Sequence, residues 1–200
     1  MLAKGQLEFL YFEGQGVAIN GTLDNAAAVD VTTTYGPEDF PLGAVQIPIT
    51  GHGYQVGDSF KRFNSIYVSG STNYNGVRKI IAVAANTVTI HATYVAETFA
   101  GTEIYQPAMT LDEPWEFVGF KVHLNTASAT TENFVLNIDS WRGSAFDWNL
   151  FTQDFNTVKD YIKTYDEPSI PLNARDAVIA TWANSNSRNW GIELIGRRFS

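Results

Sequence analysis

Three histidines are the first candidates for acid–base or metal chemistry in this chain. His52, His91 and His123 lie far apart in the sequence, and none has another histidine two or four residues away. Zinc sites usually draw on His and Cys ligands at such short spacings, and the chain contains no cysteine. We therefore expect structural histidines, with His52 in a turn and the other two in strands, where hydrogen bonds satisfy the rings.

Nucleophilic and carboxylate chemistry has little support either. Without cysteine there is no thiolate nucleophile, and no Gly-x-Ser-x-Gly or Ser-x-x-Lys pattern occurs in a supporting context. Two carboxylates could hydrolyse a glycoside, but a solvated surface position is the simpler interpretation of each acid, and no Asp-x-Asp-x-Asp calcium loop occurs. We expect no enzyme, no cofactor and no metal. The acids considered are Asp139, Asp147, Asp154, Asp160, Asp166, Glu167 and Asp176.

The tryptophans of the last third of the chain give a sharper hypothesis. Trp141, Trp148, Trp182 and Trp190 lie among many Asn and Asp residues, and exposed rings beside amides and carboxylates are typical of glycan-binding surfaces. Large aromatics at alternate strand positions more often belong to the core, and exposed ones serve as readily as interface anchors. Core or subunit contact is therefore the favoured interpretation. The candidate interface or glycan contacts are Trp141, Trp148, Tyr35 and Phe40.

Composition limits the partners. The net charge is −8, the isoelectric point is near 4.8, and no basic run exceeds the Arg197-Arg198 pair, so nucleic acid is not an expected partner. The N-terminus lacks the apolar stretch of a secretory signal, and no segment approaches the ~18 apolar residues of a membrane span. Charged residues are only 17%, and the Asn, Thr, Ser and Gly that replace them are typical of short strands and of surfaces that pack against neighbours.

The positioning elements are predicted to be strands throughout. Residues 7–13 alternate and are rich in aromatics, and Asn20-Gly21, after a second short strand, is a pair that can close a type I′ hairpin. Residues 22–31 are predicted as a loop. Residues 32–42 contain two prolines and no periodicity, so we expect an extended arm. Residues 1–50 are accordingly assigned to N-terminal strands and this arm.

Residues 51–105 show the most regular alternation of short apolar segments with Gly and Asn breaks, which predicts a small β-barrel-like module. The segments are 65–76, 77–83, 86–90 and 94–98, with turns expected at Gly57-Asp58, Asn75-Gly76 and Asn86-Thr87.

Residues 106–200 are predicted to form a β-sandwich or jelly roll after a linker at 106–114. In residues 115–124 the even positions are almost wholly apolar, so they are the expected core face, and residues 133–139 repeat the pattern. Residues 158–165 also alternate and are predicted as a strand, with a helix as the alternative. Further strands are expected at 146–151, 177–182 and 190–195, which gives the six to eight strands of an all-β sandwich.

Two stretches carry a family resemblance. The segment His52-Gly53-x-x-Val56-Gly57-Asp58, followed by residues 66–76, 81–83 and 87–90, resembles a small β module that recurs in virion proteins of tailed bacteriophages. Residues 119–124, 134–140 and 190–194 are similar to the jelly-roll domains of small virion proteins.

The resemblance implies a structural subunit of a phage virion, located in the tail, the baseplate or the capsid decoration. Such a subunit is expected to form a symmetric homo-oligomer and to contact other virion proteins through polar β surfaces and the segments 32–42 and 106–114. It implies no catalytic residue. The alternative is a glycan-binding module of a receptor-binding protein, with a host-surface glycan as its partner.

Overall fold

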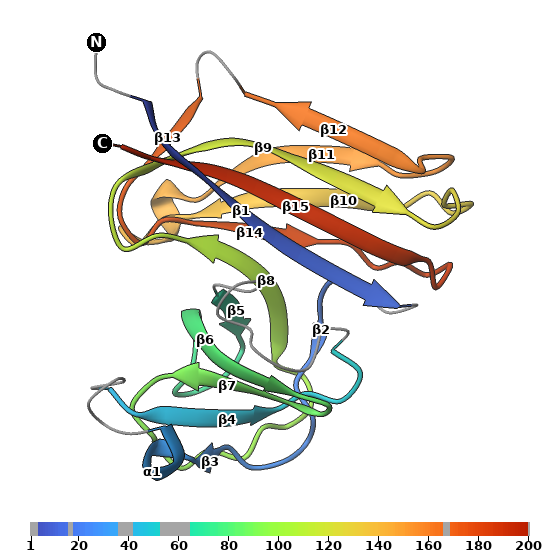
Figure 1. Ribbon diagram of the computed structural model, residues 1–200. Coiled ribbons are helices and arrows are strands. Elements are labelled where there is room, and N and C mark those ends of the chain that lie inside the picture. The colour runs from blue at the N-terminus through green and yellow to red at the C-terminus, as the bar shows by residue number, and fades with distance from the viewer. Residues whose placement is uncertain (1–3, 16–17, 36–41, 53–64, 166–168, 200) are drawn as a thin grey trace.

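The computed structural model describes residues 4–15, 18–35, 42–52, 65–165 and 169–199, which are almost entirely strands and turns. The predicted all-β class is confirmed. Two lobes are visible in Figure 1, an upper one that holds both marked chain ends and a lower one below it. Among the described residues, none of the helical segments has the length and apolar character that crossing a membrane requires.

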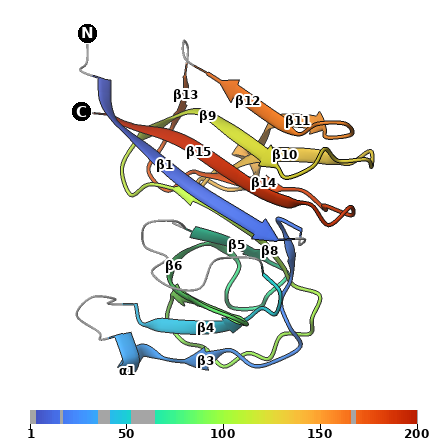
Figure 2. The same ribbon diagram turned by 45° about the vertical axis from the view of Figure 1, so that its right-hand side comes forward.

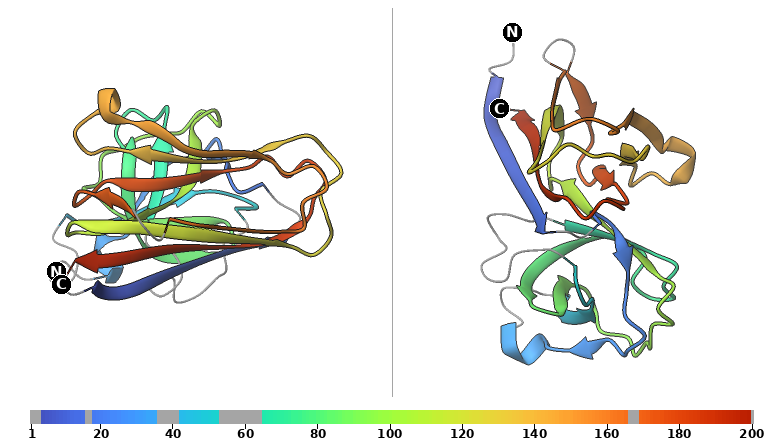
Figure 3. Two further views of the ribbon diagram at one scale, coloured as in Figure 1. Left: turned by 90° about the horizontal axis from the view of Figure 1, so that it is seen from above. Right: turned by 90° about the vertical axis from the view of Figure 1, so that its right-hand side faces the viewer.

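The upper lobe consists of two stacked sheets (Figure 3). The first sheet has the order β1-β15-β9-β12, and β13 pairs with the early part of β9. Its strands are β1 (Lys4–Gln15), β15 (Asn189–Phe199), β9 (Trp115–Leu124), β12 (Asp160–Thr164) and β13 (Ile170–Leu172). The facing part of the second sheet has the order β11-β10-β14-β8. Its strands are β11 (Trp148–Asp154), β10 (Asn133–Asp139), β14 (Ala177–Thr181) and β8 (Ile104–Thr110).

This strand order is that of a jelly roll. After β1, the chain places β8 in the second sheet, β9 in the first, β10 and β11 in the second, β12 in the first, β14 in the second and β15 in the first. All the pairings between these strands are antiparallel. Eight strands arranged as two Greek keys define the fold, so the jelly-roll prediction is met, with β1 included as its first strand.

The lower lobe is an insertion between β1 and β8. Its elements are β2 (Gly21–Thr22), β3 (Val29–Asp30), α1 (Thr32–Tyr35), β4 (Ala44–Pro48), β5 (Ser65–Ser69), β6 (Gly76–Ala84) and β7 (Thr87–His91). They continue the second sheet beyond β8 in the order β5-β6-β7-β4-β3, while β2 pairs with β8. After β2, Leu23 N donates to Glu103 O at 2.9 Å and Asp24 N to Pro48 O at 3.0 Å. These bonds join β8 to the end of β4, so the sheet curls into a barrel-like lobe (Figure 2).

The first fifty residues are therefore distributed over both lobes. The strand predicted at 7–13 is confirmed as part of β1, which pairs with β15 over Leu7–Arg197 to Gln15–Asn189. The hairpin predicted at Asn20-Gly21 is wrong, because Gly21 pairs with Tyr105 in β8 and neither turn residue has a positive φ. Asn20 instead accepts a hydrogen bond from Trp182 N at 3.1 Å through its side-chain oxygen.

Two other predictions, one for a linker and one for a short strand, are also wrong. The linker or arm at 106–114 begins as strand β8, in which Pro107, Ala108 and Met109 are buried. Residues 94–98 form no strand and contribute only an isolated bridge at Thr98. The predicted arm at 32–42 starts with the single helical turn α1; Phe40 and the turn Gly57-Asp58 lie outside the described residues.

A β-bulge in β9 changes which of its residues face the core. In the pairing with β15, Ile195 faces Gly119 but Gly196 faces Phe117, so Val118 is the extra residue. A bulge shifts the two-residue alternation by one position. The predicted core positions Phe120, Val122 and Leu124 are buried, but so are Trp115 and Phe117 before the bulge, whereas Glu116 is only partly buried. The even-numbered prediction therefore holds from the buried Val118 onward and fails at Glu116.

Aromatic rings from both sheets fill the space between them. The centroids of Phe120 in β9 and Phe134 in β10 are 5.6 Å apart, and Phe134 stacks on Phe155 at 4.9 Å. Phe155 in turn contacts Trp182 at 5.9 Å in an edge arrangement. Contacts of this kind add to the burial free energy of large rings. The jelly roll is thus a rigid support for the loops at its ends.

Candidate binding site

The tryptophans divide into two groups. Trp115, Trp182 and Trp190 are buried in the jelly-roll core, whereas Trp141 and Trp148 are 56% and 46% exposed. For these two the core interpretation is excluded, so they stay candidates for a contact with a partner or a ligand. Trp141 lies in the connection between β10 and β11, residues 140–147, which we call the tryptophan loop, and Trp148 follows it as the first residue of β11.

A buried carboxylate holds the tryptophan loop in place. Asp176 accepts hydrogen bonds from Ser140 Oγ at 3.1 Å, from Trp141 N at 3.2 Å, and from both Asn173 N and Nδ2 at 2.8 and 2.9 Å. Charge-assisted bonds of this kind are the strong ones. Asp147 Oδ1 accepts a further bond from Ser140 N at 2.8 Å. The loop therefore presents its exposed rings from a fixed backbone.

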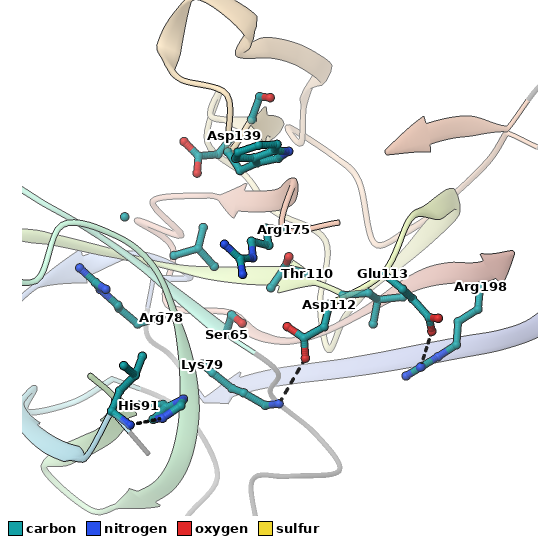
Figure 4. A pocket seen from close by; sticks show the side chains of 16 residues that line it. Ser65, Arg78, Lys79, His91, Thr110, Asp112, Glu113, Asp139, Arg175 and Arg198 are labelled. Atoms are coloured by element: carbon teal, nitrogen blue, oxygen red, sulfur yellow. Dashed lines mark hydrogen bonds and ion pairs between the residues drawn. The ribbon is translucent and has the colours of Figure 1, made fainter. Parts of the chain in front are cut away.

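The tryptophan loop borders a groove between the lobes (Figure 4). This inter-lobe groove has a volume of about 1020 Å³, at the upper end of the range for ligand sites. Asp139 and Arg175 enter it from the jelly roll, and Arg78 and Lys79 from β6 of the lower lobe. Its other described lining residues are Leu42, Ser65, Gly76, Val77, His91, Thr110, Leu111, Asp112, Glu113, Ser140, Trp141 and Arg198.

A smaller side pocket of about 330 Å³ lies on the outer face of the second sheet, next to the inter-lobe groove. Trp148 lines it together with polar side chains, and Asn149 Nδ2 donates to Asn137 Oδ1 at 3.0 Å across β11 and β10. Asp139 lines both hollows, so the hollow with Trp141 and the hollow with Trp148 share one carboxylate. The described lining residues are Tyr67, Gln106, Asn137, Ile138, Asp139, Asp147, Trp148, Asn149 and Ile179.

The Asp139 carboxylate is not neutralised by the described part of the chain. No hydrogen bond or ion pair joins its side chain to a described residue, although it is partly buried. Burial raises the pKa of Asp139, and the neighbouring acids Asp147 and Asp176 raise it further. A partly desolvated acid without a partner is a position where a ligand can supply the missing donors.

The cations of the inter-lobe groove differ in how they are paired. Lys79 Nζ lies 3.7 Å from Asp112, and Arg198 Nη1 lies 2.5 Å from Glu113. Arg78 donates to the carbonyl oxygens of Tyr74 and Asn75 at 3.3 and 2.8 Å, and burial lowers its pKa. The exposed Arg175 guanidinium has no hydrogen bond or ion pair to any residue that the structure describes.

The outer face of the first sheet is different in character. Leu7, Phe9 and Tyr11 project from β1 and are 41%, 40% and 50% exposed. We call these three side chains the apolar row. No described strand pairs with the other edge of β1, which is the terminal strand of its sheet.

Charged side chains beside the apolar row are paired with one another. Lys121 Nζ lies 2.6 Å from Glu193, and Arg197 Nη1 lies 3.2 Å from Glu116. The pKa of Tyr11 is raised by desolvation and by its contact with Glu193. On this face, the apolar row therefore lies beside ion pairs on the neighbouring strands, in which opposite charges neutralise each other.

The histidines have structural surroundings. His52 is buried, with Nε2 2.7 Å from Ala84 O, and His91 Nε2 accepts a hydrogen bond from Leu42 N at 3.2 Å. Burial lowers the pKa of both rings. His123 Nδ1 lies 2.5 Å from Asp160 on the exposed face of β9 and β12. Among the described residues, no three His, Cys, Asp or Glu side chains gather as a metal site.

Sequence reasoning named some of these residues and missed others. It named Trp141, Trp148, Asp139, Asp147 and Asp176, which lie at or beside the two hollows. Tyr35 lies apart, in α1 of the lower lobe. It missed Arg175, which no motif marks, and it missed Leu7, Phe9 and Tyr11 as an exposed row because it treated them only as strand residues.

Comparisons with known proteins found no relative of this chain. The chain matches no family model, no curated protein and no solved structure.

Proposed function

We propose that the chain is a structural subunit of a phage virion, in the tail, the baseplate or the capsid decoration, and that it assembles with itself and with other virion proteins. The observation that carries the proposal is strand β1, which combines the apolar row with an edge that no described strand pairs with. A long apolar edge strand invites pairing with another chain, and strand addition is a common mode of assembly.

A symmetric pairing of two β1 strands fits the apolar row. In a two-fold antiparallel pair about an axis normal to the sheet, facing residues must lie on the same face. Centring the pair on Phe9 places it opposite its own copy and places Leu7 opposite Tyr11, all from the exposed face. The first sheets of two subunits would then form one continuous sheet.

A single cysteine tests this register, because the chain has no cysteine of its own. Facing residues of an antiparallel pair have Cα atoms about 4.5–5.5 Å apart, which is within disulfide reach. We expect Phe9→Cys to form a covalent dimer under mild oxidation and Glu13→Cys, at the end of the strand, to form none. Light scattering should show an oligomer for the unmodified chain and a monomer for Phe9→Lys. A 22.1 kDa monomer at micromolar concentration for the unmodified chain would exclude self-assembly.

Glycan recognition is the second candidate, and the exposure of Trp141 and Trp148 beside Asp139 favours it. Aromatic faces bind the apolar faces of sugar rings, while carboxylate and amide groups accept or donate to the hydroxyls. Trp148→Ala should weaken binding to an oligosaccharide array at least tenfold with the melting temperature unchanged. Phe146→Ala is the matched control, because its ring is 58% exposed in the same loop but lines neither hollow.

A further inference from the structure

The inter-lobe groove contains two charges that the described part of the chain does not neutralise, one of each sign. Asp139 is a partly buried carboxylate, and Arg175 is an exposed guanidinium. Figure 4 shows both side chains entering the groove from the jelly roll. The exposed ring of Trp141 lines the same groove.

The backbone at Arg175 supports a role beyond the fold. Its φ is +72°, a left-handed conformation that Gly or Asn adopts more easily than Arg. The turn is held there because Arg175 N donates to Leu111 O at 2.9 Å and Asn173 N donates to Asp176 Oδ2 at 2.8 Å. Strained backbone of this kind concentrates at functional sites. An arginine kept at such a position, with no partner in the described structure, is well placed to bind an anion.

The charges around the groove define the sign of that ligand group. The chain has a net charge of −8, yet Lys79 and Arg198 are balanced by Asp112 and Glu113. Arg175 and Arg78 therefore remain as the positive end of the groove, and Asp139 is the negative end. A ligand that satisfies both ends carries an anionic group and hydroxyl donors on one framework.

We infer that the inter-lobe groove binds a carboxylate-bearing oligosaccharide, with Arg175 holding the sugar carboxylate and Asp139 accepting hydroxyl groups. A planar guanidinium binds a carboxylate through two parallel hydrogen bonds. Trp141 offers a face for the sugar ring in the groove, and Trp148 offers a second one in the side pocket beyond Asp139. This inference rests on glycan recognition, the second candidate function, and not on assembly through β1.

The test uses an array of sialylated, glucuronate and galacturonate oligosaccharides, each printed beside its carboxyl-reduced form, together with sulfated oligosaccharides that carry no carboxylate. The unmodified chain should bind at least one acidic member and lose at least tenfold in affinity when the carboxylate of that member is reduced. Arg175→Ala should weaken binding of the acidic form at least tenfold but leave the weak binding of the reduced form unchanged. Asp139→Asn should weaken both forms, because it replaces a charged acceptor with two oxygens by a neutral amide with one acceptor oxygen.

Two controls separate binding from folding. Arg142→Ala removes an exposed arginine of the tryptophan loop that lines neither hollow, and it should bind as the unmodified chain does. Arg175→Gly removes the guanidinium while suiting the left-handed backbone, so it should fold at least as stably and still lose the preference for the acidic form.

The outcomes are distinguishable. Equal binding of acidic and reduced forms, with no effect of Arg175→Ala, would overturn the carboxylate assignment and leave glycan recognition standing. Stronger binding of sulfated oligosaccharides through Arg175 would also overturn it, in favour of another anion. If no array member binds, both the inference and glycan recognition fail, while assembly through β1 is judged separately by the Phe9→Cys dimer.

Discussion

The two outer faces of the jelly roll cover the same core but differ in whether their charged side chains are paired. On the first sheet, Lys121 and Glu193 neutralise each other beside an apolar row on β1. On the second sheet, Asp139 and Arg175 have no partner among the described residues and lie in a groove with an exposed Trp141. A face with paired charges and apolar side chains suits a protein surface. A hollow with uncompensated polar groups suits a small polar ligand.

If the two proposals hold, one scaffold separates assembly on the first sheet from recognition on the second. The stacked rings between the sheets, such as Phe134 and Phe155, fix both faces without taking part in either. Both proposals therefore rest on surface positions and not on the fold itself. Three substitutions test how independent the two faces are.

Asp176→Ala should give the largest effect and should affect only the second sheet. It leaves Ser140 Oγ, Trp141 N and the Asn173 donors without their common acceptor. Removing a buried charged acceptor from several donors costs about 3 kcal/mol of unfolding free energy. Chemical denaturation should show that loss, and oligosaccharide binding should fall with it because the tryptophan loop is released.

The control is Asp112→Ala, whose carboxylate is 90% exposed in its ion pair with Lys79, and it should change stability by less than about 0.5 kcal/mol. Covalent dimer formation by Phe9→Cys should survive in the Asp176→Ala background. Loss of that dimer in a folded double variant would mean that the two faces are coupled.

Sequence patterns predicted the local elements better than their partners. The alternation of Phe134, Leu136 and Ile138 correctly identified the core face of β10, because the irregularity in its pairing with β11 places the extra residue in β11 and leaves β10 alternating. In β9 the same reasoning failed before Val118, since a bulge is set by the pairing with β15 and not by the residues of β9 alone. Long-range pairing is the information that periodicity lacks.

Strand β8 is a second case in which the sequence pattern did not reveal the pairing of a strand. Pro107 made its segment resemble a linker, yet the strand is central. Its pairing with β2 covers Ile104 and Tyr105, and its pairing with β14 begins at Ala108. Pro107 lies between the two, where no described strand needs its missing N–H on that side. Arg175 was missed for a similar reason, because a left-handed φ at arginine has no sequence signal.

Gly119→Ala should have the second largest effect, confined to the first sheet. A Cβ atom at Gly119 would collide with the backbone carbonyl of Lys163 in β12, so β9 and β12 would have to separate. The expected loss is about 2 kcal/mol of unfolding free energy, measured by thermal unfolding. Ile162→Ala, which is 65% exposed on β12, is the control and should be nearly neutral. Because β12 and β1 lie at opposite edges of the sheet, unchanged dimer formation is expected, and its loss would contradict a local effect.

Asp139→Asn should give the smallest effect, and its sign is the informative part. The folded-state pKa of Asp139 lies above its ordinary value of 3.8. The folded chain therefore binds more protons than the unfolded chain in the window above that value, and stability decreases as pH rises through the folded pKa. At pH 7 the ionised carboxylate opposes folding, so Asp139→Asn should stabilise the chain, by a small amount because the side chain is only partly buried.

The pH dependence of stability separates the effect of Asp139 from the contribution of the histidines. The lowered pKa values of His52 and His91 make both the chain and the variant less stable as pH falls below about 6.5, so their contribution cancels in the difference. The advantage of Asp139→Asn should therefore be largest at neutral pH and vanish near pH 3, where the acid is protonated in both states. A variant that gains stability and loses oligosaccharide binding identifies Asp139 as a residue retained for its ligand. A variant that is less stable at pH 7 would make Asp139 part of the support of the tryptophan loop, as Asp176 is.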